Sequence, residues 1–223
     1  MRRASIAIAL VTLAFVHGQV PSLHAEPEKW ERPEVKVGDS WTYQQKDLWT
    51  NSVQPPYTQT VEAVSEVSIR VQSTNQDGRH FNFVFTRDWN VSERPGPRKV
   101  EPYWPSYSWP LEVGKKWSGD ATWRAQDPSQ LGTWKGTFQS QVTKVEKITV
   151  AAGTFDTIKI ERRGRYVTDA TISGWRGWSG EILETVWYAP AVRRAVKFTY
   201  TDTSGSRIFS KNETELIQYK LSE

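Results

Sequence analysis

One glutamate and one arginine are the residues best placed to do chemistry. If 181–188 is an uninterrupted strand, every second side chain shares a face, and Glu184 lies among Ile182, Val186 and Tyr188. A carboxylate in such a place could serve a glycoside hydrolase together with a second carboxylate, for which Asp169 is a candidate. The same alternation, applied to 154–167, puts Arg162 on one face with Ile158, Ile160 and Tyr166. We therefore favour a buried polar pair of Arg162 and Glu184 over a catalytic role.

Other catalytic and metal chemistry has few residues to draw on. The chain has no cysteine and three histidines, of which His17 and His24 lie in the leader described below. His80 alone remains, at a strand edge beside a glycine turn, so neither a His-rich metal site nor a thiolate nucleophile can be built. We expect no catalytic residue, no metal and no cofactor, and the sequence favours a non-enzymatic protein.

Aromatic residues carry the stronger functional argument, because the chain holds twelve tryptophans. Several lie where a sheet does not require them, in the proline-broken stretch 100–111 and in the expected loop 172–180. Loops over a rigid sheet often bind ligands, although packing beneath the loop is the ordinary alternative for each ring. The predicted ligand-binding residues are Tyr103, Trp104, Tyr107, Trp109, Trp175 and Trp178.

The elements that must position these residues are strands. Alternating apolar and polar runs are separated by Gly, Pro, Asn and Asp, and we find no convincing helical stripe after the leader. Phe81, Phe83 and Phe85 share one face of a strand that should form a hairpin with 66–73. Strands are predicted over 41–47, 66–73, 80–88, 117–125, 133–150, 154–167, 181–188, 195–201 and 213–221.

A weak internal repeat suggests two related halves. Val37-Gly38-Asp39-Ser40-Trp41 returns as Val113-Gly114-Lys115-Lys116-Trp117, and each copy leads into a strand. The stretch 100–111 separates the copies and cannot be an inner strand with its three prolines. We predict an all-β fold: a curved antiparallel sheet of about ten strands, a half-barrel or open barrel, forming a single β domain over 26–223 with halves at 34–99 and 111–223.

The first residues predict export. Arg2 and Arg3 precede an apolar run over 4–16 that is too short to span a bilayer as a helix, which is the pattern of a signal peptide with cleavage after Ala25. We expect a periplasmic or secreted protein without stable membrane insertion after cleavage. Leaving these two arginines out of the count lowers the net charge from +4 to +2, which argues against nucleic acid as a partner.

The second half resembles a family of uncharacterised exported β proteins, a "domain of unknown function" family. The matching motifs lie within residues 111–200, and the family's usual proline and glycine are replaced here by Ala151 and Arg193. The resemblance implies a curved antiparallel sheet, distantly similar to the half-barrels of periplasmic lipoprotein carriers, and brings no catalytic residue. The motifs are Val113-Gly114-x-x-Trp117, Ala152-Gly153-Thr154-Phe155-Asp156 and Trp187-Tyr188-Ala189-Pro190.

Together these features predict a protein that binds a hydrophobic or amphiphilic envelope ligand, a lipid or lipoprotein, on an apolar concave face. A carbohydrate-binding module that stacks exposed Trp on a glycan is the alternative, and a glycoside hydrolase acting through Glu184 is a further one. A structural partner of another envelope protein would instead show an apolar patch on its convex side.

Overall fold

The computed structural model describes residues 29–95, 98–124, 132–172 and 175–223. The predicted signal peptide lies outside these ranges. The described chain is built almost entirely of antiparallel strands, with one short 3-10 turn, η2 (Pro190–Val192). No helix in the described ranges is long and apolar enough to cross a membrane. The predicted all-β class is confirmed.

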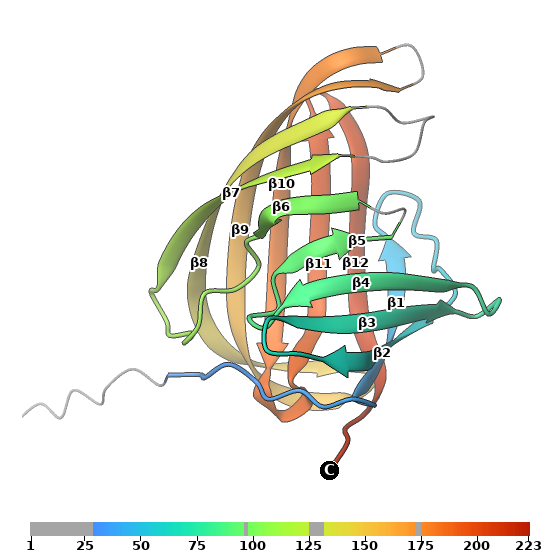
Figure 1. The fold of residues 1–223 in the computed structure, drawn as a ribbon, viewed down its shortest axis with the longest axis vertical. Helices are drawn as coiled ribbons and strands as arrows, with labels where there is room; N and C mark the ends of the chain where they lie inside the picture. The colour runs from blue at the N-terminus through green and yellow to red at the C-terminus, as the bar shows by residue number, and fades with distance from the viewer. Residues whose placement is uncertain (1–28, 96–97, 125–131, 173–174) are drawn as a thin grey trace, which may run out of the picture.

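Twelve strands form one closed ring (Figure 1). Each strand pairs with the next along the chain, and β1 pairs with β12 to close the ring. The expectation of an open or half-closed sheet is therefore wrong in this respect, because pairing between the first and last strands cannot be seen in local sequence patterns. The strands are β1 (Ser40–Asp47), β2 (Tyr57–Val64), β3 (Ser68–Asn75), β4 (His80–Thr86), β5 (Val91–Arg94), β6 (Arg98–Trp104), β7 (Lys116–Arg124), β8 (Thr133–Val150), β9 (Gly153–Ile172), β10 (Trp175–Ala189), β11 (Arg194–Ser204) and β12 (Arg207–Lys220).

Two predicted loops are partly strand. β6 occupies the first part of 100–111, and its Pro102 is tolerated because β6 pairs with β7 only at Val100 and Glu101. β10 begins at Trp175, so most of the expected loop 172–180 continues the sheet. The hairpin of β3 and β4 is present as predicted, with Gly78 at positive φ in its turn.

The repeated pentapeptide forms the same turn twice. Gly38 and Gly114 both have φ near 91°. The Gly38 amide donates to the Val61 carbonyl at 2.9 Å, and the Gly114 amide donates to the Val142 carbonyl at the same distance. The two accepting residues each begin a register shift, in β2 and β8. The first copy opens β1 and the second opens β7, six strands later.

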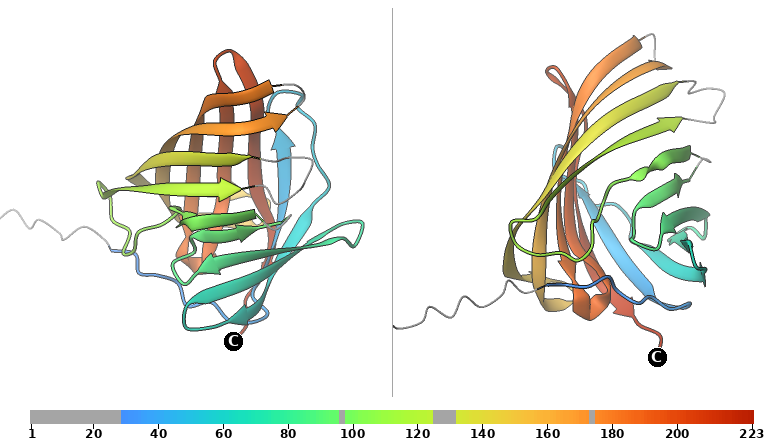
Figure 2. Two further views of the ribbon diagram at one scale, coloured as in Figure 1. Left: turned by 45° about the horizontal axis from the view of Figure 1, so that its top comes forward. Right: turned by 60° about the vertical axis from the view of Figure 1, so that its left-hand side comes forward.

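The long strands β8, β9 and β10 curve strongly and extend past β1 to β6 (Figure 2). Small residues on their inner faces leave room for rings from neighbouring strands. A Cβ on Gly164 would lie 2.4 Å from the Phe138 ring, and one on Gly180 would lie 2.4 Å from the Tyr166 ring. The rings therefore lie directly over glycine backbone, an arrangement that helps a sheet to curve.

The segment 105–111 between β6 and β7 packs against the interior. Leu111 is fully buried and exchanges backbone hydrogen bonds with Trp30. Tyr107 and Trp109 stack on each other and both meet the ring of buried Tyr188 edge-on. This β6–β7 segment therefore lies across an apolar surface. It fills the interior beside the core of Trp41, Tyr43 and their neighbours.

Candidate functional site

A chain of five aromatic side chains crosses the inner face from β6 to β12. We call this set, Trp104, Trp123, Trp134, Trp178 and Phe209, the aromatic wall. Successive ring centroids are 5.2, 6.4, 6.4 and 5.9 Å apart. Trp104 is buried, while Trp123, Trp134 and Trp178 are half-buried and Phe209 is 41% exposed. The wall thus passes from the core to solvent, which gives a ligand apolar surface that folding leaves uncovered.

The predicted ion pair of Arg162 and Glu184 is present at the buried end of the wall. The two residues are cross-strand partners on β9 and β10, and Arg162 Nη1 donates to Glu184 Oε2. The Trp104 indole donates to the same oxygen at 3.2 Å. Arg162 also donates through Nε to Ser140 Oγ at 3.1 Å and through Nη2 to the Ser106 carbonyl. Both charges are therefore satisfied inside the protein, and they tie the β6–β7 segment to the sheet.

The geometry gives no support to a hydrolase that pairs Glu184 with Asp169. The Asp169 carboxylate accepts a hydrogen bond from the Thr133 amide at 2.6 Å on the exposed face of β9. Glu184 lies on the inner face, several residue pairs away in the β9–β10 register. A glycosidase needs its two carboxyl groups on either side of one bond. These two cannot meet across a single substrate bond.

A second carboxylate lies on the inner face beside the exposed end of the wall. Tyr166 donates its hydroxyl to Asp202 Oδ1 at 2.9 Å, and the Trp178 indole donates to the same hydroxyl at 3.3 Å. Burial raises the pKa of Asp202 above its usual range, and the Tyr166 hydrogen bond opposes that rise. Burial likewise raises the pKa of Tyr166. The result is a polar group set into an aromatic surface.

The structure separates the six predicted ligand-binding residues. Trp104 and Trp178 belong to the aromatic wall, whereas Tyr107 and Trp109 pack in the β6–β7 segment. Tyr103 is 37% exposed, and the side chain of Trp175 lies outside what the structure describes.

Sequence reasoning missed three residues of the wall, Trp123, Trp134 and Phe209, and the carboxylate of Asp202. Trp123 and Trp134 fall on strands that were predicted, and the period-two pattern aligns them with Ala121 and with Phe138. That pattern could have placed both tryptophans on the inner face. It could not show that they touch, because contact depends on the register between strands.

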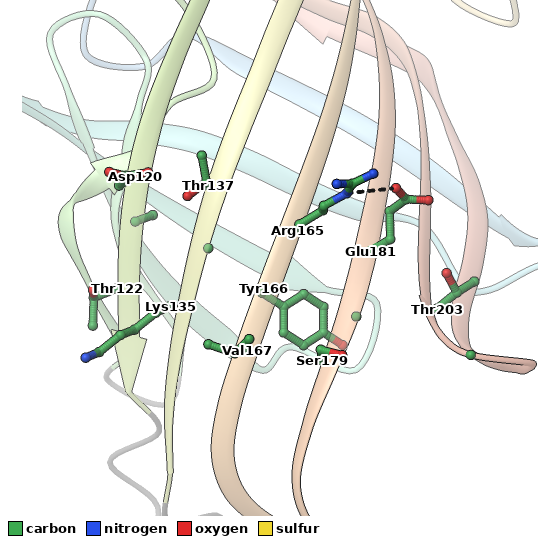
Figure 3. Close-up of a pocket in the computed structure, with 14 residues that line it drawn as sticks. Asp120, Thr122, Lys135, Thr137, Arg165, Tyr166, Val167, Ser179, Glu181 and Thr203 are labelled. Atoms are coloured by element: carbon green, nitrogen blue, oxygen red, sulfur yellow. Dashed lines mark ion pairs between the residues drawn. The ribbon is translucent and has the colours of Figure 1, made fainter.

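The outer face of the same sheet carries a polar groove (Figure 3). A depression of about 840 Å³ is crossed by the row Asp120, Thr137, Arg165 and Glu181 from four adjacent strands. Arg165 and Arg163 both reach Glu181, at 3.7 and 3.1 Å. The charges of this face largely satisfy one another in solvent, and we assign it no role. Among the described residues no group of three or more His, Asp or Glu could hold a metal ion.

Comparison with known proteins supports the fold. No family model matches the chain, so the resemblance noted from the motifs lacks that support, and no curated protein matches it. A crystal structure of a "putative lipoprotein" from Parabacteroides distasonis superposes with a TM-score of 0.53 at 15% identity, over 86% of this chain and all of that one.

Two further structures are similar at lower scores. A "putative exported protein" with a YmcC-like fold from Bacteroides fragilis gives a TM-score of 0.49 at 12% identity, covering 86% of this chain and 99% of that one. The "hypothetical lipoprotein YmcC" of Escherichia coli gives a TM-score of 0.44 at 12% identity, covering 81% of this chain and 84% of that one.

Proposed function

We propose that this is an exported, non-enzymatic binding protein that holds an amphiphilic ligand against the aromatic wall. The observation that carries the proposal is a continuous aromatic surface that begins in the core at Trp104 and ends half exposed at Phe209. The apolar part of a ligand would cover the rings. Its polar part would face Asp202 and the Tyr166 hydroxyl.

Barrel size supports this proposal. Side chains fill the interior of an eight-stranded barrel, whereas barrels with more strands enclose ligands, channels or plugs. Here twelve strands close the ring, and the β6–β7 segment fills part of the interior through Tyr107 and Leu111. The central residues of the aromatic wall, Trp134 and Trp178, belong to the long strands β8 and β10, which extend past β1 to β6 (Figure 1).

Two further points support export. The first residues have the basic and apolar pattern of a signal peptide. The Parabacteroides distasonis structure, described as that of a "putative lipoprotein", shares the fold. A location in the cell envelope would place the protein among lipids, lipoproteins and glycans, the partners considered from its composition.

Tryptophan fluorescence tests the proposal. Titration with amphiphiles below their micelle concentration should shift the emission of the wild-type protein. Trp134→Ala and Trp178→Ala should each weaken binding about tenfold, because covering the remaining half of such a ring contributes roughly 1–2 kcal/mol. Trp49→Ala is the matched control, since Trp49 is 64% exposed and takes part in none of the ring contacts that join the wall. A wild-type spectrum unmoved by every amphiphile would overturn the proposal.

A glycan is the second candidate, favoured by one observation. The ring of Trp178 lies beside hydrogen-bonding groups, the Tyr166 hydroxyl and the Asp202 carboxylate, a combination that suits the C–H face and the hydroxyls of a sugar. Retention on peptidoglycan or polysaccharide that is lost in Trp178→Ala, without a response to amphiphiles, would select this candidate.

A further inference from the structure

Asp202 lacks the partner that a partly buried carboxylate usually has. Its hydrogen bond comes from the neutral Tyr166 hydroxyl, and among the described residues no Lys or Arg forms an ion pair with it. Its cross-strand partners are Ile182, which is buried, and Ser210. Glu184, the other inner carboxylate nearby, has Arg162. A carboxylate held in place without a cation is costly, and such groups concentrate at functional sites.

Aromatic rings surround this carboxylate. The Tyr166 hydroxyl donates to it, the Trp178 indole donates to that hydroxyl, and the Phe209 ring lies 5.9 Å from the Trp178 ring. Tyr200, two residues before Asp202 on the same face of β11, has its pKa raised by burial and then by the charges of Asp202 and Glu184. Ring faces carry negative potential, so rings and carboxylate together favour a cation.

Two arginines of the chain already lie over aromatic rings of the wall. The Arg94 guanidinium lies 4.6 Å from the centre of the Trp104 ring, and that of Arg207 lies 4.9 Å from the centre of Phe209. Arg162 is committed to Glu184. Cations therefore already lie over the two end rings of the aromatic wall, Trp104 and Phe209, and among the described residues the Asp202 carboxylate forms no ion pair with either arginine.

We propose that Asp202, Tyr166, Tyr200, Trp178 and Phe209 form a recognition site for an ammonium head group, so that the ligand is a cationic or zwitterionic amphiphile. This inference rests on the proposed binding function and names the class of ligand. The ammonium would meet the carboxylate and the ring faces, and the hydrocarbon would extend along Trp134 and Trp123 toward the core. Carboxylate and rings used together are a common means of binding quaternary ammonium ions.

Matched amphiphiles test this assignment. Dodecyltrimethylammonium, dodecyl maltoside and dodecyl sulfate share one chain and differ in the head group. Each is titrated into wild type, Asp202→Asn, and the control Asp120→Asn, which removes a carboxylate from the outer face. We expect wild type to prefer the ammonium over the maltoside about tenfold. Asp202→Asn should abolish this preference, whereas Asp120→Asn should keep it.

Each result separates the two proposals. Binding of all three amphiphiles with no preference for ammonium, or a preference that survives in Asp202→Asn, overturns the head-group assignment and leaves the binding function standing. Binding of none overturns both. Near-ultraviolet circular dichroism confirms that Asp202→Asn is folded. Phe209→Leu is the second variant, since Phe209 is 41% exposed and leucine keeps an apolar contact without a ring face. It should reduce the ammonium preference about threefold.

Discussion

Asn90 and Tyr107 are joined by two hydrogen bonds that imitate a pair of strand residues. The Tyr107 amide donates to Asn90 Oδ1 at 2.7 Å, and Asn90 Nδ2 donates to the Tyr107 carbonyl at 3.1 Å. Asn90 is 3% exposed. Its side chain thereby satisfies both backbone groups of a residue that has no neighbouring strand, and it fixes the β6–β7 segment against the turn after β4.

Replacing Asn90 with Ala should destabilise the protein by about 1–3 kcal/mol, because both backbone groups of Tyr107 lose their partner in a buried place. Urea denaturation followed by fluorescence measures the change in the free energy of unfolding. Asn82→Ala on the exposed face of β4 is the control and should change it by less than about 0.5 kcal/mol. Equal effects of the two substitutions would show that the hydrogen bonds between Asn90 and Tyr107 do not contribute to the free energy of unfolding.

Arg162→Met should cost about 3–5 kcal/mol, since it leaves the Glu184 carboxylate largely buried without its cation. The double variant Arg162→Met with Glu184→Met should recover most of that loss, because two apolar side chains of similar volume replace the pair. Thermal denaturation of the single and double variants gives the coupling. A double variant less stable than Arg162→Met alone would mean that the remaining partners, Ser140 and Trp104, matter more than the charge.

Gly164→Ala should destabilise the protein by about 1–3 kcal/mol through overpacking, because the new methyl would meet the fully buried Phe138 ring. Phe138→Leu removes the ring, so Gly164→Ala should cost less in that background than in wild type. A double-mutant cycle on the free energy of unfolding measures this coupling. Additive costs would show that the ring and the glycine do not compete for the same space.

Asp202→Asn should stabilise the protein at pH 7. Burial raises the pKa of Asp202 in the folded state, so the folded state binds the proton more tightly than the unfolded state. The stability that protonation contributes is fully present below the unfolded pKa, about 4, and is lost as pH rises through the folded pKa. The gain at pH 7 should be at most about 1 kcal/mol, because solvent reaches part of the carboxyl group.

Melting temperatures of wild type and Asp202→Asn across pH 4 to 8 test this dependence. The difference between the two proteins should shrink toward the acid end. A variant that is less stable than wild type at pH 7 would show that the ionised carboxylate stabilises the fold, and the prediction would be wrong.

Period-two patterning predicted most strands, and it placed Arg162 and Glu184 on one inner face. It failed at β2, which mixes Thr, Gln and Glu with its apolar residues, and at β6, where Pro102 argued against a strand. Both are held by neighbouring strands more than by local preference. The aromatic wall was beyond the same reasoning, because Trp178 and Phe209 come together through register and through an irregularity in the β11–β12 pairing.

Arg193 shows how a departure from a motif is accommodated. The motif of the exported β proteins that the sequence resembles has glycine at this position, and the structure gives Arg193 a left-handed φ of 59°. Its guanidinium donates to both oxygens of Asp39, at 2.9 and 3.1 Å, and that carboxylate is fully buried. The Ser222 amide donates to the same group at 2.7 Å. The ion pair offsets the backbone strain and joins the turn after β10 to the place where the ring closes.

Closure between β1 and β12 makes the order of folding depend on the whole chain. Trp41 on β1 pairs with Tyr219 on β12, so this native contact of the first strand cannot form until the whole polypeptide has been synthesised. High contact order of this kind slows folding. A truncated chain that lacks β12 would leave the backbone groups of β1 and β11 without their partner, a template for aggregation with other copies. Delayed closure would also suit a polypeptide that has to cross a membrane before it folds.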